Sequence, residues 1–131
     1  MDAVLAEFGG DARAAPMHLS WHAVPDNPEQ EGSLYDEEIR TGHVRYLDLG
    51  PPRWDAPNRD HLWNWSVFAF VWPRPAIETG GRCLTKEEAK AAAEAAYRAI
   101  CDIPGARDMH MTHNRQLERM RARAKARAQR A

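Results

Sequence analysis

The chain has 131 residues, 44% of them hydrophobic, and a formal net charge of −1. This length suits one domain of ordinary size and is too short for two. The longest apolar run, Trp63 to Trp72, is interrupted by Asn64 and Ser66. It falls well below the roughly 20 apolar residues of a membrane-spanning helix, so we expect no membrane segment.

The two cysteines, Cys83 and Cys101, are too few for a disulfide framework. The first residues are acidic and lack the basic start of a secretory signal. Both features are typical of a protein that works in a reducing compartment, so we expect a cytoplasmic location.

The small net charge hides an asymmetry along the chain. Residues 1–81 carry 13 acidic and 6 basic side chains, whereas residues 115–131 carry 7 basic and 1 acidic. Opposed charges of this kind indicate an acidic body with a basic tail. Such a tail can bind an acidic partner, or it can fold back on its own body.

The first part of the chain predicts one strand and a polar loop. We expect residues 1–16 to be a flexible segment. Alternating side chains predict a strand from Met17 to Val24. A pair of prolines stops this strand, and residues 25–33 are polar enough for a loop. Residues 34–40 fit either a helical turn or an irregular sheet edge.

Three further stretches predict strands. His43 to Leu49 alternates between polar and apolar side chains. Leu62 to Trp72 is apolar on both faces over its second half, which predicts a strand buried on both sides. Gly81 to Leu84 forms a short last strand after a Gly-Gly turn.

The clearest helix signal begins at Thr85. Thr85 and Glu88 have the spacing of a capping box, and alanines then recur at helical spacing up to Ile100. Pro104 and Gly105 end this helix. A second helix is predicted from Asn114 to Arg127, and its thin apolar stripe indicates that it docks weakly or stays exposed.

Together these patterns predict an α+β fold. We expect a small antiparallel sheet of three or four strands covered by one long helix, with a peripheral basic C-terminal helix. The predicted division of the chain is a flexible N-terminal segment (residues 1–16), an α+β domain (residues 17–105) and a basic C-terminal helix or tail (residues 106–131).

The sequence contains none of the common catalytic motifs. No G-x-S-x-G, P-loop or G-x-G-x-x-G stretch occurs, so we expect no enzyme activity and no cofactor. His18 and His22 have the spacing of a metal-ligand pair, as do His110 and His113. No third ligand is evident beside either pair, so the sequence does not decide between a metal site and ordinary histidines.

Two groups of residues are candidates for binding a partner. The basic tail suits phosphates, because the guanidinium group is forked and weakly hydrated. Its nucleic-acid-binding candidates are Arg115, Arg119, Arg121, Arg123, Lys125 and Arg127. Surplus tryptophans and an acidic loop suit a protein partner. These candidates are Trp54, Trp72, Asp36, Glu37 and Glu38. Tryptophans that plug the sheet edges and a merely solvated acidic loop are the alternatives.

Three stretches of the chain form a recurrent pattern. They are Leu19-Ser20-Trp21-His22-Ala23-Val24-Pro25, Trp63-Asn64-Trp65 and residues 88–97. Over residues 17–101 this pattern resembles short uncharacterised proteins of phages and prophages, especially those of alphaproteobacteria. The resemblance implies a phage or mobile-element setting, and hence the cytosol of a host cell, but it implies no activity.

The leading hypothesis from the sequence is a non-enzymatic phage or prophage accessory protein. It would bind a host or phage protein complex and occupy its surface, for example as an inhibitor of a host defence or nucleic-acid-processing complex. The acidic body suits this role because it can compete for basic nucleic-acid grooves. A second hypothesis is a nucleic-acid-binding accessory factor that uses the tail. A third is a virion or assembly component that forms a homo-oligomer through the apolar third strand.

Overall fold

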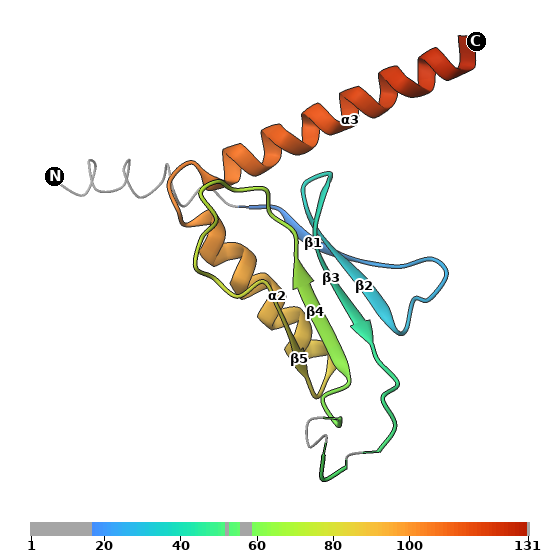
Figure 1. The fold of residues 1–131 in the computed structure, drawn as a ribbon, viewed down its shortest axis with the longest axis vertical. Helices are drawn as coiled ribbons and strands as arrows, with labels where there is room; N and C mark the ends of the chain where they lie inside the picture. Colours follow the sequence, from blue (N-terminus) through green and yellow to red (C-terminus); the bar gives the residue numbers. More distant parts are fainter. Residues whose placement is uncertain (1–16, 52, 56–58, 131) are drawn as a thin grey trace, which may run out of the picture.

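The computed structural model describes residues 17–51, 53–55 and 59–130, and the predicted flexible segment, residues 1–16, lies outside them. The described chain forms a five-stranded antiparallel sheet in which each strand pairs with the next along the sequence (Figure 1). Two helices follow the last strand. The elements are β1 (Leu19–Ala23), β2 (Glu31–Asp36), β3 (Ile39–Tyr46), β4 (Trp63–Val67), β5 (Gly80–Cys83), α2 (Lys86–Cys101) and α3 (Ala106–Arg130).

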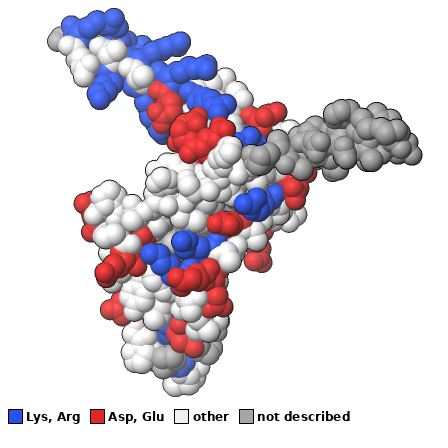
Figure 2. Space-filling model, turned by 180° about the vertical axis from the view of Figure 1, so that it is seen from behind, with Lys and Arg blue, Asp and Glu red and all other residues white. Residues whose placement is uncertain are grey.

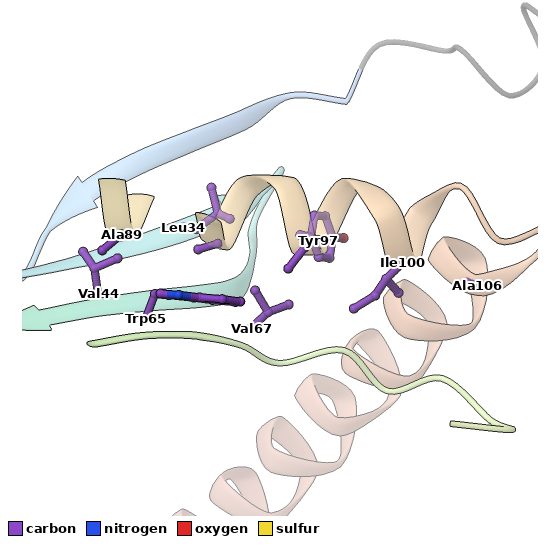
Figure 3. Close-up of a cluster of buried hydrophobic side chains, with 10 residues drawn as sticks. Leu34, Val44, Trp65, Val67, Ala89, Tyr97, Ile100 and Ala106 are labelled. Atoms are coloured by element: carbon purple, nitrogen blue, oxygen red, sulfur yellow. The ribbon is translucent and has the colours of Figure 1, made fainter. Parts of the chain in front are cut away.

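The hydrophobic core lies between helix α2 and one face of the sheet (Figure 3). Leu34, Val44 and Trp65 project from three neighbouring strands and are buried against the helix. The facing positions of α2 include Ala89 and Ala93, which are fully buried. Because alanine is small, the helix can lie close to the sheet and leave room for the indole of Trp65. The predicted α+β architecture is confirmed.

Helix α2 begins where the sequence predicts. The side-chain oxygen of Thr85 accepts a hydrogen bond from the backbone N–H of Glu88 at 3.1 Å, which caps the first turn. The helix ends at Cys101, shortly before Pro104. Its inward stripe runs through Ile100, as the alanine spacing predicts.

Residues 34–40 form neither a helical turn nor an irregular edge, and this prediction is wrong. They contain the end of β2, a turn at Glu37 and Glu38, and the start of β3. Glu37 has a positive φ of 55°, a conformation that glycine and asparagine take most easily. This turn contains neither glycine nor asparagine, so the sequence gives no local signal for the hairpin. The sheet therefore has five strands rather than three or four.

The predicted third strand ends earlier than expected. Strand β4 stops at Val67. Beyond it, Phe68, Phe70 and Trp72 are 41%, 49% and 75% exposed. The expectation of a strand that continues to Trp72 and is buried on both faces is therefore wrong. After Phe68 the chain leaves the sheet and contacts the start of α3.

Helix α3 begins at Ala106, well before the predicted start at Asn114. The additional turns contain its buried residues, which are Ala106, His110 and Met111. The thin apolar stripe of the predicted helix therefore describes only the outer part of α3. The part that docks on the body lies before it in the sequence.

Replacing Leu34 by alanine should remove packing at the centre of the core, because this side chain is fully buried. We expect the free energy of unfolding to fall by about 2–5 kcal/mol, measured by chemical denaturation. Leu84→Ala is the matched control, since Leu84 is 52% exposed. It should change the free energy by about 0.5 kcal/mol or less. Equal losses for the two variants would contradict this placement of the core.

Candidate nucleic-acid interface on the C-terminal helix

Helix α3 is anchored at one end and projects from the body at the other (Figure 1). All of its buried residues lie before Asn114. From Arg115 to Arg130 every side chain except that of Leu117 is exposed. This outer part is built mainly from Arg, Ala, Gln and Lys, which are strong helix formers. The helix can therefore persist there without packing against the body.

The outer part of α3 carries a line of arginines that we call the arginine row. It consists of Arg115, Arg119, Arg123 and Arg127. Its members are four residues apart, so they lie along one side of the helix at intervals of roughly 6 Å. Figure 2 shows that basic side chains crowd the outer helix, whereas acidic ones gather where it meets the body. The projecting part is thus strongly cationic.

The carboxylate of Asp36 anchors the inner part of α3. Asp36 ends strand β2 and is fully buried. Arg107 of α3 donates two hydrogen bonds to it, from Nε to Oδ2 and from Nη2 to Oδ1, both at 2.8 Å. The hydroxyl of Tyr97, from α2, donates a further bond to Oδ2. A two-pronged Arg–carboxylate contact is strong and directional, so it fixes α3 against both the sheet and α2.

The surroundings of Asp36 keep it ionised. Burial by itself raises the pKa of this carboxyl group, but the hydrogen bonds from Arg107 and Tyr97 outweigh burial and hold the pKa below its usual range. The pKa of Tyr97 is raised, by burial first and by its bond to Asp36 second. The phenol therefore keeps the proton that it donates.

A second support comes from the chain segment after β4. The backbone N–H of Phe70 donates to Nδ1 of His110 at 3.1 Å. The Phe70 ring stacks on His113 with 3.8 Å between ring centroids and 11° between planes. Burial lowers the pKa of His110, and the Asp36 carboxylate opposes this shift without cancelling it. A neutral imidazole suits the site, because Nδ1 must accept a hydrogen bond.

A third support joins the arginine row to the β2–β3 turn. Arg115 contacts Glu37 at 3.3 Å and Glu38 at 3.2 Å. All three side chains are well exposed, so each pair contributes little to stability. Their geometric effect is that the row begins at the edge of the body and runs outward from it.

The structure divides the predicted nucleic-acid-binding residues into two groups. Arg115 is engaged with the hairpin turn, as an intramolecular contact of the tail. The other candidates are exposed on the projecting helix: Arg119, Arg121, Arg123, Lys125 and Arg127. Of these, Arg121 lies 3.8 Å from Glu118 in an exposed pair on the same helix. Most of the predicted cationic surface is therefore open to solvent.

The predicted partner-binding residues do not form one surface. Asp36 is fully buried, which is incompatible with its predicted role as a contact for a partner. Glu37 and Glu38 bind Arg115. Trp54 is 94% exposed and Trp72 is 75% exposed, so neither plugs a sheet edge. They lie in the connections before and after β4, which are at opposite ends of the sheet (Figure 1).

The two histidine pairs have different surroundings. His22 lies 2.9 Å from the Ser20 hydroxyl on the exposed side of β1. His110 and His113 face the segment around Phe70, as described above. In residues 17–51, 53–55 and 59–130, no group of three or more His, Cys, Asp or Glu side chains is arranged to hold a metal ion.

The residues that anchor α3 cannot be recognised from the sequence. Arg107 lies 71 residues from Asp36 along the chain, so no local pattern connects them. The sequence around Tyr97 gives no sign that its hydroxyl binds a carboxylate. One signal was present: Asp36 shares the alternation of Leu34, which places an acidic residue on the buried face of the strand.

The helices in the described part of the chain are too short or too polar to cross a membrane. Comparisons with protein families, with characterised proteins and with solved structures find no significant match to this chain.

Replacing Asp36 by asparagine should weaken the anchor, because it removes the charge that Arg107 binds in a largely buried setting. We expect the free energy of unfolding to fall by about 2–4 kcal/mol. Glu37→Gln also removes one acidic charge but acts on an exposed pair, and should cost less than about 1 kcal/mol. Denaturation of both variants checks this, and similar losses would contradict a dominant role for Asp36.

The anchor should also make the fold sensitive to acid. The pKa values of His110 and Asp36 are below their ordinary values of 6.5 and 3.8, so the unfolded chain binds more protons as the pH falls. Stability should be full above about pH 6.5 and decline below it as His110 is forced to charge. It should decline further below about pH 4, as the pH falls toward the lowered pKa of Asp36.

His110→Gln separates these two effects, because glutamine can still accept the Phe70 N–H but does not titrate. In denaturation curves taken over a pH series, the variant should lose the first decline and keep the second. If the variant and the parent protein show the same first decline, His110 is not its source.

Proposed function

We propose that this protein binds nucleic acid through the projecting part of helix α3. The observation that carries this proposal is the arginine row, which stands on one side of a helix with solvent around it. The forked guanidinium group matches the geometry of phosphate and of carboxylate groups. Such a row contacts the sugar-phosphate backbone, and these contacts do not read the base sequence. We therefore expect binding of low sequence specificity.

The anchoring of α3 supports this role. Because Arg107 fixes the helix on the buried Asp36, the outer arginines are held in a defined direction from the body. Arg115 already engages Glu37 and Glu38, which leaves the outer members of the row directed away from the acidic turn. Within the described residues no ion pair joins Arg119, Arg123 or Arg127 to the body.

Salt dependence is the direct test of this proposal. About three phosphate contacts, from Arg119, Arg123 and Arg127, should give a slope of about −2 to −3 in a plot of log affinity against log salt. Replacing these three arginines together by glutamine should reduce the slope by about 2 to 3 units, because each phosphate contact contributes about one unit. Glutamine is a good helix former, so circular dichroism should show an unchanged helix.

The matched control replaces three exposed body arginines, Arg53, Arg74 and Arg98, by glutamine. It removes the same charge but should leave the slope unchanged. A chain that binds neither DNA nor RNA at low salt, or one whose affinity falls equally in both triple variants, contradicts the proposal.

A second candidate is the surface-occupying phage or prophage accessory protein, which inhibits a host complex. The exposure of Trp54 and Trp72 supports it, because tryptophans are frequent anchors of protein interfaces. The acidic part of this hypothesis has less support, since Asp36 is buried. Trp54→Ala and Trp72→Ala should each weaken a stoichiometric complex recovered from host lysate, and recovery of no such complex would count against it.

Self-association as a virion or assembly component has less support than either. This hypothesis requires a third strand that runs to Trp72 with two apolar faces. Because β4 ends at Val67, the structure lacks the second half of that strand. A single monomer mass in light scattering would argue against it.

A further inference from the structure

The sheet has a second face, opposite α2, that no described element covers. Pairing in the antiparallel register places Tyr35 beside Arg40, His43 beside Ser66, and Arg45 beside Asn64. These positions alternate with the core residues on the same strands, so they project away from α2. We call this surface the open face, and its side chains are polar, basic or aromatic.

The open face is basic, although the chain as a whole is close to neutral. Its arginines, Arg40, Arg45 and Arg82, are all exposed. The acidic side chain among them is Glu31, which contacts His43 at 2.9 Å. Three guanidinium groups against one partnered carboxylate make the open face complementary to an anionic ligand.

Aromatic rings lie among these arginines. Phe68 is 41% exposed, and the guanidinium of Arg40 lies 5.0 Å from its ring centroid. Tyr35 is partly buried and packs edge-on against His22, with ring centroids 4.9 Å apart. Aromatic rings and guanidinium planes are the groups on which proteins stack unpaired bases. The projecting helix itself offers no such rings beyond its anchored turns.

A groove connects the open face with helix α3. Its walls are the β2–β3 hairpin, with Tyr35 and Arg40, and the helix, with Asn114, Arg115 and Arg121. Its volume of 420 Å³ falls within the range of about 300–1,000 Å³ that ligand pockets occupy. Glu38 and Glu118 also line the groove, where they pair with Arg115 and Arg121. A chain of phosphates that runs along α3 therefore passes these ion pairs and then meets Arg40 and the rings of Tyr35 and Phe68.

We propose that the ligand is single-stranded nucleic acid, which passes from α3 through this groove onto the open face. This inference rests on the nucleic-acid binding proposed above and adds the kind of strand. Phosphates contact Arg121 and Arg40, and bases stack on Phe68 and Tyr35. A duplex keeps its base faces stacked inside, so it can use the arginine row but not these rings.

The test compares a single-stranded oligonucleotide of about 16 nucleotides with a duplex of the same number of phosphates. Fluorescence anisotropy should show tighter binding of the single strand by the parent protein. Phe68→Ala should weaken binding of the single strand by about 5-fold to 100-fold and leave binding of the duplex unchanged. Trp72→Ala is the matched control, because Trp72 is also exposed but lies beyond the end of strand β4.

Tyr35 is partly buried, so its role is tested without removing its ring. Tyr35→Phe keeps the ring and should retain full affinity for the single strand. Photo-crosslinking of an oligonucleotide that carries 5-iodouracil should attach it to the peptides that contain Tyr35 or Phe68 in the parent protein. Crosslinks confined to α3 would overturn the proposed path.

The outcomes separate this inference from the proposed function. If the parent protein binds duplex and single strand equally, or Phe68→Ala changes nothing, the open face does not bind bases, while binding by the arginine row stands. If light scattering shows a dimer that Phe68→Ala dissociates, the open face binds a second copy and the inference is overturned. If the parent protein binds no nucleic acid at low salt, both proposals fail.

Discussion

The buried carboxylate of Asp36 is the group on which the arrangement of this molecule depends. It lies at the end of β2 and accepts hydrogen bonds from Tyr97 of α2 and from Arg107 of α3. A buried carboxylate is costly unless charged and hydrogen-bonded partners compensate for its lost hydration. Because these partners come from two helices, only one placement of α3 relative to the sheet satisfies all of them. The direction in which α3 leaves the body follows from this requirement.

The basic side chains of α3 therefore have two roles. Arg107 and Arg115 hold the helix to the body, the first on a buried carboxylate and the second on exposed ones. Arg119, Arg123 and Arg127 continue the same line into solvent. A tail that simply folded back on an acidic body would bury or pair these outer arginines as well. Their exposure is the basis for the proposed binding of an anionic ligand.

The parts of the fold that local chemistry determines could be predicted from the sequence. The capping box at Thr85 and the alanine spacing that follows it specify α2 within a few residues of its position. The β2–β3 hairpin was missed, because its turn places Glu37 at positive φ without glycine or asparagine. The anchor was missed because Asp36 and Arg107 meet only in the folded chain. The basic tail can be predicted from composition alone. The open face cannot, because only the strand register shows which side chains share one face of the sheet.

Hydrogen exchange of the full chain, with and without a single-stranded oligonucleotide, tests the central claim most directly. In the free protein the anchored turns of α3, residues 106–115, should exchange slowly. Residues 116–130 should exchange fast, because all of their described side chains except that of Leu117 are exposed. The oligonucleotide should slow exchange in residues 116–130 and leave α2 unchanged. Protection that appears only on the body, with the outer helix unaffected, would contradict the account.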